Sequence, residues 1–153
     1  MLSQDSPNVS GRPEIGDAFG ATLTTGDFNG DGIDDLAVGV PGESIGQAQN
    51  AGAIHIFNGR ARSILAGARE HALSQSSPEV SGVVEDGDLF GSTLTAGDFN
   101  GDGIDDLAVG VPGESIGQIE DAGVIHIFNG QAGTDLAGAR EHALRQNSPD
   151  VPE

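Results

Sequence analysis

The hydrophobic positions of this chain fall in short runs, each closed by turn residues such as Pro-Gly or Asn-Gly. Small and apolar residues alternate in the first run, and two further runs are mostly apolar. Short runs bounded in this way predict β-strands rather than long helices. In the first half of the chain the expected strands cover residues 19–28, 35–40 and 53–57. A fourth strand is expected at residues 69–75, although the Ala, Leu, Arg and Glu of residues 64–75 also suit a short helix.

The same pattern occurs twice, because the segment that starts at Asp17 recurs at Asp88, 71 residues later. About four in five paired positions of the central stretch are identical, and the match extends back to Leu2-Ser3-Gln4, which recurs as Leu73-Ser74-Gln75. Internal repeats of this kind indicate a repeat architecture. We interpret residues 1–14 as the tail of a preceding repeat or a linker, 15–82 as the first unit and 83–153 as the second.

A repeat of 71 residues is too long for one turn of a leucine-rich or ankyrin solenoid, and it suits a four-stranded β-propeller blade. We therefore expect an all-β fold with two four-stranded antiparallel blades. Each blade exposes two apolar faces that neighbouring blades must bury, and a closed ring usually has about four to eight blades. One chain is thus an incomplete ring, and we expect a homo-oligomer in which three or four copies close a ring of about six or eight blades.

Composition narrows the range of partners. The formal net charge is -18, from 24 acidic and six basic residues, which argues against binding to nucleic acid or to anionic membrane surfaces. There is no Cys, so disulfides and thiolate zinc sites are excluded. The sequence contains no apolar run long enough to span a bilayer and does not begin with a basic and apolar leader. Neither membrane insertion nor a signal peptide is therefore expected in this chain.

An acidic loop, Asp-Phe-Asn-Gly-Asp-Gly-Ile-Asp-Asp, follows the first expected strand of each unit. Side-chain oxygens stand at loop positions 1, 3, 5 and 9, and position 7 offers a backbone carbonyl. Calcium is a hard cation that takes about six to eight oxygen ligands. We therefore predict one Ca²⁺ per blade and two per chain. The expected ligands are Asp27, Asn29, Asp31, Ile33 and Asp35 in the first loop, and Asp98, Asn100, Asp102, Ile104 and Asp106 in the second.

The first half of this loop is similar to an EF-hand, but position 12, where an EF-hand carries Glu, is Val38 or Val109. The closing ligand is therefore expected at position 9, in Asp35 and Asp106. The alternative is a solvated Asn/Asp/Gly hairpin turn without an ion. Two features favour the ion: the loop is repeated without change, and its carboxylates would repel one another if nothing neutralised them.

Other polar and aromatic residues give weaker signals. Asp34 and Asp105 fall out of phase with the ligands, and we expect them to face solvent or to support the ligands from outside. The Arg-Glu pairs at 69–70 and 140–141 are expected to be solvated charge. We expect His55, His71, His126 and His142 to be strand side chains at the blade surfaces. The expected contacts between blades come from Phe19, Phe28, Phe57, Phe90, Phe99 and Phe128.

Three elements in a fixed order give the chain a family resemblance: Phe-Gly at 19–20 and 90–91, the acidic loop, and Gly-Val-Pro at 39–41 and 110–112. On these residues the chain resembles the FG-GAP repeat family, which forms the β-propeller of integrin α-subunits and many bacterial surface proteins. The resemblance implies calcium held between the first two strands of each blade, an extracellular or cell-surface location, and a role in adhesion or ligand recognition. It does not extend to the integrin ligand site, since the chain has two units and no Arg-Gly-Asp motif.

We therefore expect a calcium-binding scaffold for extracellular adhesion or protein-ligand recognition, in which calcium is structural. No enzyme activity is expected, because no nucleophile elbow is present and the clustered carboxylates are explained as calcium ligands. Three alternatives stay open. One is a lectin-like propeller that binds carbohydrate, against which the absence of Trp and Tyr counts. Another is an accessory domain of a calcium-dependent hydrolase. The third is an excised or engineered two-blade fragment that self-assembles into a ring. The sequence does not identify the protein or glycan ligand.

Overall fold

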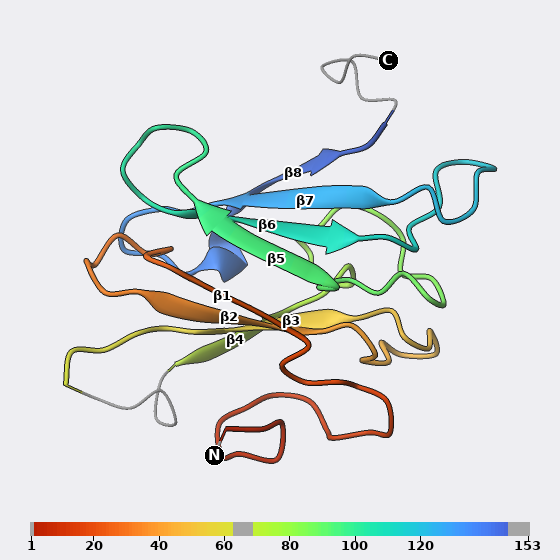
Figure 1. The fold of residues 1–153 in the computed structure, drawn as a ribbon, viewed down its shortest axis with the longest axis horizontal. Helices are drawn as coiled ribbons and strands as arrows, with labels where there is room; N and C mark the ends of the chain where they lie inside the picture. Colours follow the sequence, from red (N-terminus) through yellow and green to blue (C-terminus); the bar gives the residue numbers. More distant parts are fainter. Residues whose placement is uncertain (1, 63–68, 147–153) are drawn as a thin grey trace.

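The computed structural model describes residues 2–62 and 69–146, which form two four-stranded sheets (Figure 1). Blade 1 contains β1 (Thr22–Gly26), β2 (Asp35–Val40), β3 (Ala53–Phe57) and β4 (Glu70–Leu73). Blade 2 contains β5 (Thr93–Gly97), β6 (Asp106–Val111), β7 (Val124–Asn129) and β8 (Arg140–Leu144), with one turn of 3-10 helix, η2 (Leu136–Gly138), before β8. Each strand pairs antiparallel with the next one along the chain. The expected all-β fold with two four-stranded antiparallel blades is therefore confirmed.

The central strands of blade 1, β2 and β3, begin and end at the residues that the hydrophobic pattern predicts. β1 is shorter than its predicted range of 19–28, because a turn closed by Ala21 N–H and Ala18 C=O precedes it and the acidic loop follows it. The fourth segment is a strand at Glu70–Leu73, as expected. The alternative helix at 64–75 falls partly on residues 64–68, which lie outside the described residues.

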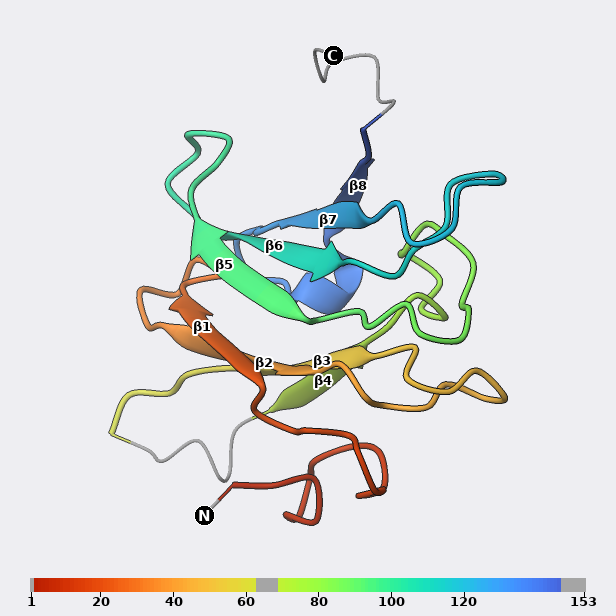
Figure 2. The ribbon, with the colours of Figure 1, turned by 45° about the vertical axis from the view of Figure 1, so that its right-hand side comes forward.

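The two blades stack face to face, with their first strands β1 and β5 side by side (Figure 2). The main core cluster draws residues from both blades, including Phe28 and Ile54 from blade 1 and Phe90, Leu107 and Phe128 from blade 2. All five side chains are almost completely buried. Each blade thus covers one face of the other, and each has a second face that the other blade does not cover.

Backbone contacts bring the blades close together. A Cβ on Gly39 would overlap the carbonyl oxygen of Gly91, so β2 approaches the start of blade 2 at a distance that a side chain at this position would block. The amide of Phe90 donates to the carbonyl of Ala51 at 2.8 Å, and Thr22 Oγ1 donates to the carbonyl of Gly91 at 2.8 Å. The interface between the blades therefore combines hydrogen bonds with apolar burial.

The phenylalanines divide between several environments. Phe28, Phe90 and Phe128 lie in the core between the blades. Phe57 belongs to a second cluster with Phe19, within residues 2–57 and thus on blade 1 and its N-terminal segment. Phe99 is 52 % exposed, on the side of blade 2 that blade 1 does not cover. The expectation that all six pack between blades is therefore wrong for Phe19, Phe57 and Phe99.

Both sheets fall inside the predicted units 15–82 and 83–153, although those boundaries remain a prediction and reach beyond the described residues. Residues 2–14 contain no strand and lie beside blade 1 (Figure 1). Within residues 2–62 and 69–146, no helix is both long enough and apolar enough to cross a lipid bilayer.

Candidate functional site

The acidic loops are the connections between the first two strands of each blade. In blade 1 the loop leaves β1 after Gly26 and enters β2 at Asp35. In blade 2 it leaves β5 after Gly97 and enters β6 at Asp106. Gly30 and Gly32 have φ of 69° and 83°, the left-handed conformation that lets the loop curl between antiparallel strands.

In the first loop the side chains at positions 1, 3 and 5 turn inward onto the loop's own amides. Asp27 Oδ1 accepts from the amide of Asp31 at 3.0 Å, and Asp27 Oδ2 accepts from that of Gly32 at 2.8 Å. Asn29 Oδ1 accepts from Asp31 N–H at 3.0 Å, and Asp31 Oδ1 accepts from Ile33 N–H at 2.9 Å. The oxygen atoms of these three side chains thus gather on the inside of one tight turn.

Asp35, at position 9, is buried below the loop and ties its two ends together. Its carboxylate accepts from the amides of Phe28 at 3.2 Å and Gly59 at 2.8 Å, and from Asn29 Nδ2 at 3.1 Å. Burial raises the pKa of Asp35 to about 6, the two amides oppose this shift, and the charges of Asp31 and Asp27 add to it. A divalent cation near this carboxylate would favour its ionised form.

The second loop has the same arrangement. Asp98 accepts from the amides of Gly101, Asp102 and Gly103 at 2.7–3.0 Å. The amide of Gly103 is the largest of the causes that lower the pKa of the Asp98 carboxyl below its usual value. Asp106 is buried like Asp35 and accepts from the amides of Phe99 at 3.0 Å and Gly130 at 2.9 Å. The remaining contacts of the loop also recur, from Asp102 N–H to Asn100 Oδ1, Ile104 N–H to Asp102 Oδ1 and Asn100 Nδ2 to Asp106 Oδ1.

The donor set suits a hard cation, since it consists of carboxylate and amide oxygens on the inside of a turn. In the described part of the chain, however, no group of three or more His, Cys, Asp or Glu side chains is placed so that it could hold a metal ion. The loop amides occupy the carboxylates at position 1, and Asp35 bonds to Asn29. The hydrogen bonds described for Ile33 and Ile104 are donated by their amides. The oxygen atoms of the ten predicted ligands suit Ca²⁺ chemically, but their present arrangement is that of a hydrogen-bonded turn. The ligand positions therefore remain a prediction.

A carboxylate from blade 2 braces the first loop from outside. Asp105 Oδ2 accepts from the amide of Asp27 at 3.0 Å, and the amide of Asp105 donates to the carbonyl of Asp27 at 3.2 Å. Its counterpart in the repeat, Asp34, is exposed. Of the two roles expected for these residues, Asp105 supports the loop of the neighbouring blade, and Asp34 faces solvent in the single chain.

Two buried histidine-glutamate pairs were not anticipated from the sequence. His55 Nδ1 lies 2.5 Å from Glu70 Oε1, and His126 Nδ1 lies 2.6 Å from Glu141 Oε1. The expectation of solvated glutamates is therefore wrong, and so is that of surface positions for His55 and His126. The repeated spacing of 15 residues between His and Glu was the available signal, because β3 and β4 pair antiparallel. In contrast, His71 is only partly buried and its Nε2 lies 2.6 Å from Asp135 Oδ2, across the two blades.

The fold and the twice-repeated loop define a protein built from β-propeller blades. The FG-GAP repeat model matches residues 19–57 and 90–128, about half of the chain, with one match in each blade. The chain belongs to the FG-GAP repeat family.

Comparison with curated proteins places integrin α-subunits among the relatives. The chain is 33 % identical over 135 residues to Integrin alpha-PS2 of Drosophila melanogaster, a match that covers 85 % of this chain and 9 % of that protein. It is 40 % identical over 97 residues to Integrin alpha-X of Mus musculus, covering 62 % and 8 %. A third relative is Phosphatidylinositol-glycan-specific phospholipase D of Mus musculus, 33 % identical over 112 residues, covering 73 % and 13 %. The chain thus spans about a tenth of the length of these relatives.

Proposed function

We propose that this chain is a calcium-stabilised pair of propeller blades that acts in adhesion or protein-ligand recognition outside the cell or at its surface. The family membership and the integrin relatives support adhesion. One relative carries the name of a phospholipase, so the repeat itself is not tied to one activity. We propose that the present blades are not catalytic.

The observation that carries the calcium proposal is the identical set of inward-facing oxygens in both loops, each above a buried aspartate. Asp27, Asn29 and Asp31 turn toward the inside of the loop, and Asp35 closes its base. Asp98, Asn100, Asp102 and Asp106 repeat this arrangement. Bound calcium would supply positive charge between carboxylates that otherwise repel one another.

The proposed calcium role is structural. A ligand that binds the folded state alone stabilises it by about 2.7 kcal/mol when its free concentration is a hundred times Kd. Extracellular calcium modules commonly have Kd values of about 10⁻⁴–10⁻³ M. Loops of that affinity would fill outside cells and release calcium at the low concentrations of a cytosol.

Thermal unfolding with and without calcium tests the proposal. We expect the melting temperature of the wild-type chain to rise with Ca²⁺ concentration, and equilibrium dialysis to give two bound ions per chain. The double variant Asp27→Ala and Asp98→Ala should lose both effects. As a matched control, Glu79→Ala and Asp121→Ala remove two exposed carboxylates outside the loops and should leave the calcium response intact. An unchanged calcium response in the Asp27/Asp98 double variant would refute the site.

A glycan array separates protein recognition from carbohydrate recognition. The chain has no Trp or Tyr, the side chains that most often stack on sugars in lectin pockets. We therefore expect no glycan signal above that of a chain unfolded by heat. A saturable signal that needs calcium would instead establish the lectin-like alternative.

A further inference from the structure

The chain contains one complete blade-blade interface in its middle and one half of such an interface at each end. In the middle, blade 2 covers one face of blade 1. The opposite side of blade 2 carries the same residues as that covered face, 71 positions later. We call it the blade 2 open face and define it by Thr93, Gly110, Ile125 and Leu144, the counterparts of Thr22, Gly39, Ile54 and Leu73.

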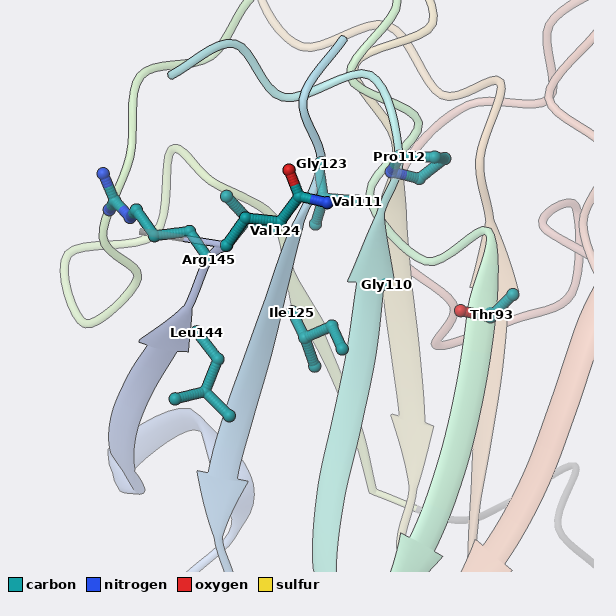
Figure 3. A pocket seen from close by; sticks show the side chains of 10 residues that line it. Thr93, Gly110, Val111, Pro112, Gly123, Val124, Ile125, Leu144 and Arg145 are labelled. Atoms are coloured by element: carbon teal, nitrogen blue, oxygen red, sulfur yellow. The ribbon is translucent and has the colours of Figure 1, made fainter. Parts of the chain in front are cut away.

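The exposed fractions show that the blade 2 open face is equivalent to the covered face of blade 1, but has no blade packed against it. Ile54 is 0 % exposed, whereas its counterpart Ile125 is 47 % exposed. Leu73 and Leu144 differ in the same way, at 3 % and 37 %. Ile125 and Leu144 lie side by side on β7 and β8 and line a shallow pocket of about 460 Å³ (Figure 3).

In blade 1 the equivalent position is filled by the segment that leads into β5. Gly87, Leu89 and Phe90 of this segment donate their amides to the carbonyls of residues 49–51 at 2.8–3.1 Å. The next residue, Gly91, packs so closely on Ile54 that a Cβ would lie 2.8 Å from Ile54 Cγ2. The pocket on blade 2 is therefore the empty counterpart of the position that residues 86–91 occupy on blade 1.

The other end of the chain carries a copy of the covering segment. Residues 15–20 are the counterpart of 86–91 and include Phe19-Gly20 in place of Phe90-Gly91. Behind them Leu23 is 60 % exposed, whereas its counterpart Leu94 packs against the core between the blades. We call this surface the blade 1 open face and define it by residues 15–20, Leu23 and Asp34.

The residues next to the blade 1 open face have a charge and a backbone conformation that suit a contact with the blade 2 open face. Between the blades, the amides of Gln131 and Gly133 donate to the carbonyls of Phe28 and Asn29 at 3.2 and 2.8 Å. Their counterparts in blade 1 are Arg60 and Arg62. Arg62 has a φ of 61°, close to the 74° of Gly133, although residues other than glycine rarely adopt this conformation.

The two arginines would meet the second acidic loop. That loop carries Asp98 and Asp102, both exposed, and arginine next to carboxylate is a favourable pair at an interface. Asp34 would take the position of Asp105 and accept from the amide of Asp98, as Asp105 accepts from Asp27.

We propose that the blade 2 open face binds the blade 1 open face of a second copy of this chain, head to tail, through the contacts that blade 1 and blade 2 make within the chain. Such an interface is heterologous, so it forms a ring if its rotation closes and a filament if it does not. This inference does not rest on the proposed role in adhesion.

One segment must move when two copies dock. Leu2-Ser3-Gln4 and residues 144–146 are both counterparts of residues 73–75. Gln4 Nε2 donates to Glu43 at 2.6 Å, as Gln75 Nε2 donates to Glu114 at 2.5 Å. In the docked pair, Gln4 of one copy and Gln146 of the other would compete for the same Glu43, and one of them must leave it.

The test is the native mass of the full chain, measured by analytical ultracentrifugation over a wide range of concentrations. We expect masses that are whole multiples of 15.4 kDa and rise with concentration. Ile125→Lys places a charge in the blade 2 open face, and Leu23→Lys places one in the blade 1 open face. Each change should weaken self-association by at least about 100-fold, because an unpaired charge would be buried. Val83→Lys, at a residue 68 % exposed and outside both faces, should associate like the wild type.

Mixing the two blocked variants decides the geometry. The Leu23→Lys chain keeps an intact blade 2 open face and the Ile125→Lys chain keeps an intact blade 1 open face. Together they should form a one-to-one pair that grows no further, while each alone stays a monomer. Matching melting curves in dilute solution would show that both variants fold.

Two results would overturn the proposal. One is a wild-type chain that stays monomeric at all concentrations, which would leave the open faces to other blades. The other is self-association of either blocked variant at the wild-type strength, which would indicate a two-fold dimer through one face or contact elsewhere.

Discussion

Nδ1 of His55 and Oε1 of Glu70 lie 2.5 Å apart, with side chains only 2 % and 7 % exposed, and the pair joins β3 to β4 in blade 1. Ser10 Oγ also donates to Oε1 at 2.8 Å, so the same carboxylate holds the N-terminal segment. Burial raises the pKa of Glu70, but the hydrogen bonds from His55 and Ser10 outweigh it and leave the pKa below its usual value. The outer strand β4 is thus held by a buried polar contact as well as by its backbone hydrogen bonds to β3.

Glu70→Ala should therefore destabilise the chain by about 1–3 kcal/mol, because it leaves a buried histidine N–H without an acceptor. Glu70→Gln keeps an acceptor oxygen and should cost less. Urea denaturation followed by circular dichroism measures both. Glu79→Ala, at an exposed carboxylate, should change the free energy of unfolding by less than about 0.5 kcal/mol. Equal effects of Glu70→Ala and Glu79→Ala would contradict a stabilising role for the pair.

Asp88 should make stability depend on pH. Its side chain is completely buried, and burial is the largest cause that raises its pKa from 3.8 to about 6, with Glu114, Glu85 and Asp86 adding negative charge nearby. The folded chain therefore keeps a proton on Asp88 that the unfolded chain releases at lower pH. As pH rises from about 4 to about 6, this group lowers the free energy of unfolding.

Asp88→Asn removes that ionisation and keeps an oxygen that can accept from the amide of Glu85. We expect the variant to gain stability relative to the wild type as pH rises through this window and to keep the gain at pH 7. Melting temperatures measured at several pH values give the difference. Asp121→Asn, at an exposed position, should show no such trend. If the melting temperatures of Asp88→Asn and the wild type differ by the same amount at every pH, titration of Asp88 is not the cause of the difference.

The brace between blades can be measured with a matched pair of substitutions. Asp105→Ala removes the acceptor for the amide of Asp27 and should cost about 1–2 kcal/mol. Asp34→Ala makes the same change at the exposed counterpart and should be nearly neutral in dilute solution. Chemical denaturation at low protein concentration compares the two. Similar losses at both positions would show that the contact with Asp27 contributes little.

A second matched pair tests the close approach of the backbones. Gly39→Ala would force a Cβ onto Thr22 Oγ1 and onto the carbonyl oxygen of Gly91 in the next blade. Gly110→Ala meets Thr93 Oγ1 in its own blade, a side chain that can rotate away. We expect Gly39→Ala to cost about 1–3 kcal/mol more than Gly110→Ala, as overpacking against fixed backbone does. If both variants unfold at the same urea concentration, the blades have room to separate slightly.

The hydrophobic pattern was sufficient to predict the four strands of blade 1, although β1 is shorter than its predicted range. β2 and β3 match their predicted limits, because apolar runs between turn residues leave little choice of boundary. The acidic loop was also placed correctly between the first two strands, since the glycines and aspartates that close the turn are all local in sequence.

Contacts between distant segments could not be predicted in the same way. Glu70 looks solvated next to Arg69, and its burial follows from the pairing of β3 with β4, which brings it beside His55. Likewise, nothing local distinguishes Asp34 from Asp105. Asp105 is bonded to Asp27 because it lies on the side of its loop that faces blade 1. Asp34 is exposed because the same side of the first loop has no neighbouring blade.

The reach of Asp105 into the first loop makes two loops of identical sequence physically different. A cation entering the loop of Asp27 meets a turn already held by the neighbouring blade, whereas the loop of Asp98 is held only by the hydrogen bonds within its own blade. Calcium titrated into the single chain should therefore bind in two steps of unequal affinity. Any contact that adds a neighbour to blade 2 would make the steps merge, so the shape of a binding curve would report how many of the loops have a blade beside them.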